Sequence, residues 1–433
     1  MRLRLLQVKP SWKRRAQAAS ATRVKPLLQD LKEPAAIAFS GGGDSTALLH
    51  LCADHPHITH AFIIDHGLRQ GSAAEVAKAG KFARSLGYHA QSNRWTHDGV
   101  ETGIQNKARA YRYAAMGQMC RDAGLKHLIT AHTADDQAET LVMRLDRQTG
   151  WRGLAGMRSL ALAPLWPALM GVTLHRPLLG VSRKALRDYN AQQGLFCVDD
   201  PSNENLDFAR VRARQFLLAD QSLRRDLLEQ QIGALHRLTS ERQSQAQWLS
   251  RFAKISPHGF VETSAVPSAE LLQHILNAVS GKGEPIDAVK RRRLSHAMSE
   301  SSFSGTTLAG AWVLKTHHGF LFTRDMVAVK GRRNLPDGGA LRGVQVKAGE
   351  AQLWDGRFLV QALDHGLTIN PALGFLNKLH DVTETKDIFD LPSEVRGCLP
   401  VYQSGQNILG FGGLSHKKVK AIAVSAQRLQ TLI

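Results

Sequence analysis

The feature that most constrains the fold is a glycine-rich segment placed between an apolar run and an amphipathic one. Residues 35–39 form a short apolar run of strand length, and Ser-Gly-Gly-Gly-Asp-Ser follows at 40–45. Residues 46–53 then show the composition of a helix. A buried strand that enters a helix through a tight glycine turn is typical of sheets whose strands alternate with helices.

The residues after this segment repeat the same alternation. Further strands are predicted at 58–64, 88–95, 125–131 and 172–179, and further helices at 73–86, 104–123 and 135–145. Strands that alternate with helices favour an α/β fold with a doubly wound parallel sheet and helices on both faces. We expect this fold to extend to about residue 215.

The rest of the chain has a different pattern. Helices are predicted at 217–252, 271–279 and 286–298, a β-hairpin at 308–323, and strands at 344–347 and 357–363. The expected organisation is a basic N-terminal extension at 1–34, the α/β domain at 35–215, a mostly helical domain at 216–325, and a small α+β or β-rich domain at 326–433.

Charge indicates the class of partner. Lys and Arg outnumber Asp and Glu, and the formal net charge is +19. Such an excess favours a polyanionic partner, with nucleic acid first and an acidic membrane surface second. No run approaches the roughly 18 apolar residues of a membrane span, so we expect no membrane insertion.

The N-terminal extension carries much of this charge. Basic residues precede the first acid, Asp30: Arg2, Arg4, Lys9, Lys13, Arg14, Arg15, Arg23 and Lys25. The extension lacks the apolar core of a secretory signal. We interpret it as a solvated tail, and an organelle transit peptide or an RNA-contacting arm stays open.

The glycine-rich turn has the chemistry of a phosphate loop. Gly41, Gly42 and Gly43 let the backbone approach an oxyanion, and the helix start directs N–H groups at it. Ser40, Ser45 and Thr46 add hydroxyl groups. Asp44 would repel a bare phosphate, so its presence indicates a bridging Mg²⁺. The segment matches neither the Walker A loop nor the dinucleotide-binding turn.

Ser-Gly-Gly-x-Asp-Ser resembles the loop of the N-type ATP pyrophosphatases, or PP-loop superfamily. This resemblance implies that Ser40, Gly41, Gly42, Gly43, Asp44 and Ser45 bind ATP. It also implies that the enzyme splits ATP to AMP and pyrophosphate while it adenylates a carbonyl oxygen. The loop alone does not distinguish among members of the superfamily.

Further segments narrow the resemblance. They stand at 65–69, 106–113, 130–140, 150–157, 176–179, 199–203 and 210–214. In this order and spacing the set resembles the tRNA(Ile)-lysidine synthetase family, strongly over 35–215, weakly over 216–325 and poorly beyond. The resemblance implies ligation of L-lysine to C2 of the wobble cytidine in the anticodon loop of tRNA(Ile), with ATP and Mg²⁺. It also implies a cytoplasmic enzyme, and a homodimer is left open.

Three acids are the candidate cation ligands. Asp135, Asp136 and Glu139 share one face near the start of a predicted helix. They suit Mg²⁺ or the ammonium of lysine, whereas acids at a helix start also simply favour the helix dipole. We assign lysine binding to all three and metal binding to Asp44 and Asp136, and which acid meets which cation stays open.

Two arginines complete the candidate catalytic set. Arg109 and Arg112 are three residues apart on a predicted helix, and either can neutralise charge on the α-phosphate. The catalytic residues proposed are therefore Asp44, Arg109, Arg112, Asp135, Asp136 and Glu139. His66 and His132 follow strands, and each suits adenosine contact or a structural role equally well.

Other features separate the rival functions. The four cysteines, Cys52, Cys120, Cys197 and Cys398, form no Cys-x-x-Cys pair, which argues against a 2-thiocytidine-type enzyme. His55, His57 and His60 lack partners for a convincing zinc set. Basic runs at 290–293 and 417–420 suit RNA backbone contact or a solvated face. A non-catalytic RNA binder stays the alternative from a different class.

Overall fold

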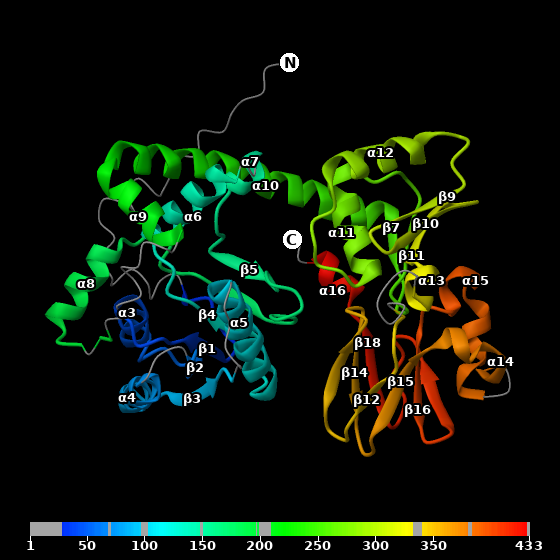
Figure 1. Ribbon diagram of the computed structural model, residues 1–433, viewed down its shortest axis with the longest axis horizontal. Helices are drawn as coiled ribbons and strands as arrows, with labels where there is room; N and C mark the ends of the chain where they lie inside the picture. Colours follow the sequence, from blue (N-terminus) through cyan, green and yellow to red (C-terminus); the bar gives the residue numbers. More distant parts are fainter. Residues whose placement is uncertain are drawn as a thin grey trace. The chain divides into compact units, whose positions relative to one another are not determined.

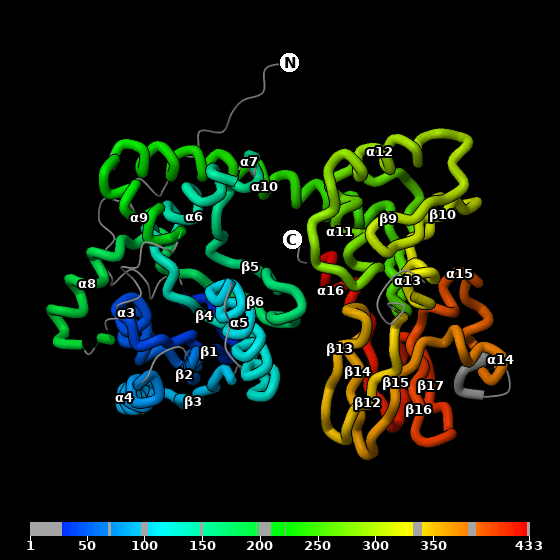
Figure 2. The backbone as a smooth tube through the Cα atoms, in the orientation of Figure 1, coloured from blue at the N-terminus to red at the C-terminus, as the bar shows by residue number. Residues whose placement is uncertain are grey.

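The computed structural model describes residues 28–67, 71–96, 103–147, 150–195, 197–198, 209–331, 340–379 and 383–430. The basic residues 2–25, Arg69 and the segment 199–203 lie outside this part of the chain. The chain divides into two compact units, Met1–Ser240 and Glu241–Ile433. Figures 1 and 2 show the elements of each unit, which are described separately below.

The first unit is built on a six-stranded sheet. Its strands are β1 (Ala35–Ala38), β2 (Ile58–Asp65), β3 (His89–Arg94), β4 (His127–Ile129), β5 (Leu160–Leu162) and β6 (Thr173–His175). Their spatial order is β3-β2-β1-β4-β6-β5. All neighbouring pairs are parallel except β5 with β6. The predicted parallel sheet is confirmed, whereas the antiparallel strand β5 was not predicted.

The first unit contains several helices, and those that contribute to its two main cores cover both faces of the sheet. They are α3 (Gly43–Leu51), α4 (Ser72–Ser85), α5 (Ile104–Asp122), α6 (Ala134–Asp146), α7 (Gly150–Leu154), α8 (Arg183–Gln192), α9 (Ala209–Ala219) and α10 (Gln221–Phe252), the last continuing into the second unit. Ile37 of β1 lies in a core with Leu48 of α3 and Leu186 of α8. The next residue back, Ala36, lies in the opposite core with Met116 of α5. Alternate residues of one strand thus bury both faces.

The strand order creates a switch point. From β1 the chain moves outward to β2 and β3, and it then returns to place β4 on the other side of β1. The connections after β1 and β4 therefore leave the sheet in opposite directions. Open α/β sheets bind ligands in the crevice at such a point, at the carboxyl ends of the strands. The glycine-rich loop follows β1, and the predicted acids follow β4.

The second unit begins with a five-stranded antiparallel sheet. Its strands are β7 (Ala253–Ile255), β8 (Val261–Thr263), β9 (Gly305–Leu308), β10 (Ala311–Thr316) and β11 (Gly319–Arg324). Helices α11 (Ala269–Ser280) and α12 (Ala288–Ser299) accompany it. Ile275 and Val279 of α11 share a core with Val313 and Phe322. The predicted hairpin is present as β10 and β11, and the three shorter strands were not predicted.

The end of the chain contributes two smaller antiparallel sheets. Their strands are β12 (Val344–Val346), β13 (Ala351–Trp354), β14 (Phe358–Ala362), β15 (Leu367–Pro371), β16 (Pro400–Ser404), β17 (Asn407–Phe411) and β18 (Val419–Ala423). The orders are β12-β15-β16-β17 and β13-β14-β18. Trp354, Phe358 and Tyr402 lie in their shared core.

Short helices complete this unit. They are α13 (Met326–Lys330), η4 (Ala372–Gly374), α14 (Leu376–Leu379), η5 (Thr383–Asp390), α15 (Ser393–Arg396) and α16 (Ser425–Gln430). A buried ion cluster joins the five-stranded sheet to the hairpin of β13 and β14, since Asp355 accepts hydrogen bonds from Nε of Arg324 at 3.0 Å and Nε of Arg357 at 2.7 Å. The mixture of small sheets and helices confirms the α+β character predicted for the end of the chain.

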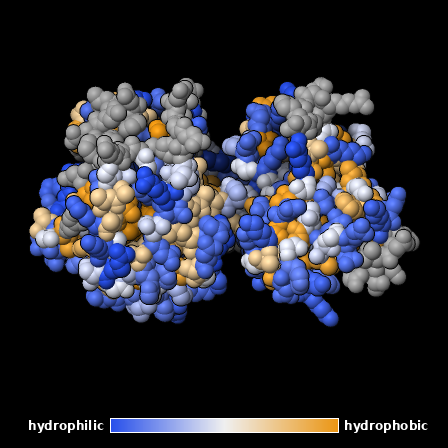
Figure 3. Space-filling model, turned by 60° about the horizontal axis from the view of Figure 1, so that its bottom comes forward, coloured by the Kyte–Doolittle hydropathy of each residue, from blue (hydrophilic) through white to orange (hydrophobic). Residues whose placement is uncertain are grey.

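On the face drawn in Figure 3, hydrophobic residues lie among hydrophilic ones. Among the described residues, no helix combines the length and the apolar character needed to cross a membrane.

Candidate active site

The glycine-rich loop connects β1 to α3 and is held in shape by its own hydroxyl groups. Ser45 Oγ donates to the Gly42 carbonyl at 2.9 Å, and Thr46 Oγ1 donates to the Gly41 carbonyl at 3.1 Å. The hydroxyls of Ser40 and Ser45 lie 3.1 Å apart. Sequence reasoning assigned these hydroxyls to a ligand, whereas those of Ser45 and Thr46 donate within the loop. The first N–H groups of α3 remain the natural donors to an anion.

Residues from later in the chain support the loop from outside. Gly41 has φ of +81°, and a Cβ there would lie 3.3 Å from Val198. The Val198 N–H donates to the Gly41 carbonyl at 2.9 Å. Asn190 of α8 donates from Nδ2 to the Gly43 carbonyl at 2.8 Å. Sequence reasoning missed Asn190 and Val198, because no local pattern connects them with the loop.

The predicted acids lie at the start of α6, as the spacing indicated. Thr133 caps the helix, and its N–H and hydroxyl donate to Asp136 Oδ2 at 2.8 and 2.7 Å. Asp136 is 9% exposed and Glu139 is 1% exposed. Asp136 therefore serves as a helix cap through one oxygen and leaves Oδ1 for another partner. Asp44, Asp135, Asp136 and Glu139 are called the acid cluster below.

One arginine joins the acid cluster to the loop. Arg183, the first residue of α8, donates from Nε to Asp44 Oδ2 at 3.3 Å. Its Nη2 contacts Asp136 Oδ1 and its Nη1 contacts Glu139 Oε1, each at 3.2 Å. The Arg183 N–H also donates to Asp135 Oδ2 at 2.7 Å. Sequence reasoning did not single out Arg183, although it stands just after the segment at 176–179 that supported the family resemblance.

Three further arginines reach the acid cluster from α9 and α10. Arg210 Nε lies 3.2 Å from Glu139 Oε2, and Arg214 Nε lies 2.8 Å from Glu139 Oε1. Arg224 Nη2 lies 3.1 Å from Asp135 Oδ1. Among the ion pairs of the described residues, four arginines thus meet four carboxylates. The acid cluster is neutralised within the protein.

Burial and these pairs shift the pKa values of the acid cluster. Burial raises the pKa of Asp44 to about 6, with Asp136 and Asp135 adding to the rise and Arg183 opposing it. Burial also acts to raise the pKa of Asp136, but Arg210, Arg183 and Thr133 outweigh it and hold that pKa below its ordinary value. Asp136 is therefore firmly ionised at neutral pH, and Asp44 is the more readily protonated acid.

A second charged group lies at the same sheet edge. Arg109 and Arg112 of α5 each lie over the ring of Tyr113, at 4.9 and 5.3 Å from its centroid. Arg176 follows β6 and donates from Nη1 to the Arg158 carbonyl at 2.8 Å. The three arginines and His132 are called the arginine cluster below.

The arginine cluster is buried enough to shift its own protonation. Burial lowers the pKa of His132 to about 3; Arg176, Arg112 and Arg109 lower it further, and Asp136 opposes them. Burial likewise lowers the pKa of Arg112 and of Arg176. The buried Nε atoms of Arg112 and Arg176 have no hydrogen-bond partner among the described residues. The cluster therefore presents cationic donors beside a neutral imidazole.

The histidines noted in the sequence at positions 66 and 55 both lie outside helices and strands. His66 lies in the described segment after β2, where the Gly67 N–H donates to Asp65 Oδ1 at 2.9 Å. His55 contacts the Leu28 carbonyl at 3.0 Å through Nε2. In the described parts of the chain, no set of three or more His, Cys, Asp or Glu side chains is arranged as a metal site.

The basic run on α12 is not uniform. Arg291 donates to the carbonyls of Ile286 at 3.0 Å and Ala269 at 2.7 Å, so it fixes the local structure. Lys290, Arg292 and Arg293 are exposed. The second run, Lys417, Lys418 and Lys420, is exposed as well.

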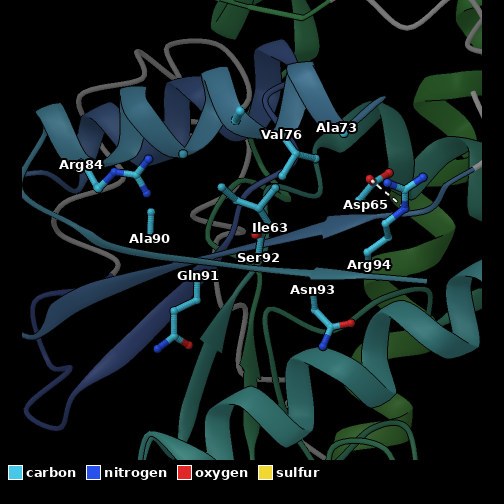
Figure 4. A pocket seen from close by; sticks show the side chains of 12 residues that line it. Ile63, Asp65, Ala73, Val76, Arg84, Ala90, Gln91, Ser92, Asn93 and Arg94 are labelled. Atoms are coloured by element: carbon cyan, nitrogen blue, oxygen red, sulfur yellow. Dashed lines mark ion pairs between the residues drawn. The ribbon is translucent and has the colours of Figure 1, made fainter. Parts of the chain in front are cut away.

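A pocket of about 330 Å³ lies between α4 and the strands β2 and β3. Figure 4 shows Arg84 at one end and the ion pair of Asp65 with Arg94 at the other. Ile63 and Val76 form its apolar middle. Asp65 and Arg94 are the last residues of their strands. One end of the pocket therefore lies at the same carboxyl edge as the loop after β1.

Comparisons with known proteins identify the family of this chain. The sequence profile of a family described as the PP-loop domain matches residues 16–221. A tRNA(Ile)-lysidine synthase of Hyphomonas neptunium is 36% identical over 303 residues, which cover 66% of this chain and 81% of that protein.

Two further relatives carry the same name. The protein of Ruegeria pomeroyi is 31% identical, with 75% of this chain and 76% of the relative covered. The protein of Caulobacter vibrioides is 30% identical, with 93% of this chain and 89% of the relative covered. This chain therefore belongs to the tRNA(Ile)-lysidine synthase family of PP-loop proteins.

Proposed function

We propose that this chain catalyses the ATP-dependent ligation of L-lysine to C2 of the wobble cytidine of tRNA(Ile) with a CAU anticodon. The products are lysidine, AMP and pyrophosphate. The observation that carries the proposal is the meeting of the phosphate loop and the acid cluster at the switch point of the sheet, in a member of this family. One edge thus offers both an anion site and a site for an alkylammonium ion.

The loop would hold the phosphates of ATP. Amides at the start of α3 face the anion, while Ser45 and Thr46 keep the loop in shape. We propose that the pocket beside Asp65 and Arg94 receives the nucleoside, since it begins at the same edge of the sheet.

Asp44 and Asp136 fit a magnesium ion. Both carboxylates lie within 3.3 Å of the same guanidinium group, so they face one cationic position. Mg²⁺ is usually held by one or two carboxylates together with phosphate oxygens and water. Bound there, the ion would neutralise charge on the phosphates of ATP.

The arginine cluster would serve the first chemical step. The cytosine O2 attacks the α-phosphorus, a P–O bond to pyrophosphate breaks, and an O-adenylated base results. Arg112 and Arg109 stabilise the negative charge that develops on the α-phosphate oxygens. Because His132 is neutral, it contributes a hydrogen bond rather than a charge.

The acid cluster would serve the second step. The neutral ε-amine of lysine attacks C2, a C–N bond forms while the C–O bond to AMP breaks, and the nitrogen releases one proton. Asp136 and Glu139, with Asp135 at the rim, would attract the ammonium ion. We propose that a carboxylate of this cluster accepts a proton, because only the neutral amine is a nucleophile.

The tRNA would bind through phosphate contacts over basic surfaces. The net charge of +19 and the exposed residues Lys290, Arg292 and Arg293 support this part of the proposal. Such contacts position an RNA without selecting it. We propose that the enzyme acts in the cytoplasm.

A thiolase is the alternative within the superfamily, and the cysteines do not favour it. All four are free thiols. Burial raises the pKa of Cys120 to about 12 and that of Cys398 to about 11, and Cys52 is buried too. Thiols that stay protonated are poor nucleophiles and poor ligands for a cluster.

The test supplies the protein with ATP, Mg²⁺, tRNA(Ile) transcript and radiolabelled L-lysine. Label should enter the tRNA only when ATP is present, and a tRNA with uridine at the wobble position should stay unlabelled. Incorporation of sulfur from a sulfide donor without lysine would favour the thiolase. Binding of tRNA without any turnover would favour a non-catalytic RNA binder.

A further inference from the structure

The acid cluster contains its own cation. The Arg183 guanidinium contacts Asp44, Asp136 and Glu139 at 3.2–3.3 Å. These carboxylates come from two separate segments, the phosphate loop and α6. A single group therefore fills the position toward which the candidate lysine-binding acids converge.

The charges around this position are balanced only while Arg183 is in place. Arg210 and Arg214 pair with Glu139, and Arg224 pairs with Asp135. If the Arg183 side chain left, Asp44 and Asp136 would lose the arginine they share, and the four carboxylates would exceed the remaining arginines by one charge. This excess of negative charge favours cations, namely Mg²⁺ at Asp44 and Asp136 and the alkylammonium of lysine at Asp136 and Glu139, and it repels an anion.

The backbone of Arg183 is anchored independently of its side chain. Its N–H donates to Asp135 Oδ2, and Ser182 caps α8 by accepting from the Ala185 N–H at 3.2 Å. The Arg183 side chain is 17% exposed, whereas the Glu139 side chain that it contacts is 1% exposed. The Arg183 side chain thus reaches solvent, and its departure from the acid cluster would not require the start of α8 to move.

The phosphates of bound ATP would offer Arg183 a second set of partners. Asp44, which contacts its Nε, belongs to the phosphate loop. Guanidinium groups pair with phosphate oxygens through two parallel hydrogen bonds, as they also do with carboxylates. Phosphates bound at the loop would therefore compete with the acid cluster for Arg183.

We propose that Arg183 is an internal stand-in for the ε-ammonium of L-lysine, and that bound ATP draws it onto the phosphates and opens the lysine site. Arg183 is then a positioning residue that makes lysine binding depend on ATP. The inference rests on the proposed function for the identity of the ammonium ligand. It explains how an enzyme avoids holding lysine when no activated base can form.

The test measures lysine affinity by calorimetry with and without a non-hydrolysable ATP analogue and Mg²⁺. The folded wild-type protein should bind lysine at least about tenfold more tightly with the analogue, a coupling of ordinary size. Arg183→Gln should bind lysine tightly in both conditions, so that the ratio falls to about one. Arg187→Gln, an exposed position one turn along α8, should keep the wild-type ratio.

Two results would overturn the inference: wild-type affinity that ignores the analogue, or Arg183→Gln that keeps the full ratio. Arg183→Met replaces the first variant if unfolding curves show that Gln is not tolerated. The wild-type comparison needs no variant and decides by itself whether coupling exists. If coupling is present but labelled lysine never enters tRNA, the proposed function fails while the stand-in role is retained. Turnover without coupling would instead retain the proposed function and refute the stand-in role.

Discussion

The acid cluster and the arginine cluster lie at the same carboxyl edge of one sheet, but their charges are balanced in different ways. In the acid cluster, each carboxylate meets at least one arginine within 3.3 Å. In the arginine cluster, no carboxylate of the described residues lies within ion-pair distance of Arg109, Arg112 or Arg176. Burial lowers the pKa of both Arg112 and Arg176.

The difference distinguishes two kinds of binding site. A cation entering the acid cluster has to displace an arginine, so its affinity depends on what else binds Arg183. An anion entering the arginine cluster meets cationic donors that are already in place and poorly solvated. The protein is thus prepared for phosphate before it is prepared for lysine, which agrees with adenylation before lysine attack.

The largest effect should come from Asp44, which belongs to both the loop and the acid cluster. Asp44→Asn should lower the rate of lysidine formation by roughly 100-fold or more, because it removes a charge from the proposed magnesium site. The affinity for tRNA, measured by filter binding, should change less than about twofold. Asp188→Asn on α8, whose carboxylate pairs with exposed Lys184, is the control. Parallel loss of turnover and tRNA affinity would contradict two separate sites.

Arg112 tests whether the arginine cluster is a prepared anion site. Arg112→Met should slow adenylation, measured as pyrophosphate release, by about 100-fold, as expected for loss of a transition-state donor. The melting temperature should be unchanged or higher, since burial of the guanidinium is unfavourable. The exposed Lys107→Met on the same helix is the control. A large fall in melting temperature would show that Arg112 has a structural role instead.

The pH dependence of stability tests whether His132 of the arginine cluster is neutral in the folded protein. Its folded pKa of about 3 lies below the ordinary value of 6.5, so the unfolded chain binds a proton that the folded one refuses. Its contribution to stability is complete above pH 6.5 and is lost as the pH falls toward 3. Between pH 7 and pH 4 the wild type should lose about 3 kcal/mol more than His132→Asn. Urea unfolding at both pH values measures the free energy of unfolding of each protein. If both proteins lose the same amount, the folded protein accepts a charged imidazole at position 132, and the lowered pKa is refuted.

The smallest effect concerns the basic surface of α12 in the second unit. Replacing Lys290, Arg292 and Arg293 by Ala should weaken tRNA binding about tenfold and lower the salt slope by roughly one for each phosphate that is no longer neutralised. Lysine affinity should stay the same. Arg291 is left intact because it holds two carbonyls. An unchanged salt slope would mean that this face is only solvated.

Much of the first unit was predictable because its signals are local. The run at 35–39 became β1, and the helix that follows begins at Gly43 rather than at residue 46 because the loop forms its first turn. The spacing of Asp135 and Glu139 placed both at the start of α6. In contrast, β5, β7 and β9 were not predicted, because each is a short antiparallel strand defined by pairing with a neighbour and not by a place in the alternation of strands and helices.

By itself, the sequence determined the α/β alternation, the phosphate loop after the first strand and the acids on one helix face, because each depends on residues within a few positions of one another. Only the tertiary structure decided that Arg183 neutralises those acids and that Asn190 and Val198 support the loop. Their partners lie about 40 to 160 residues away in the chain and meet at a switch point set by strand order. Ion pairs between distant segments produce no local sequence pattern, because their energy depends on the distance between the charges in space and not on their separation in the sequence.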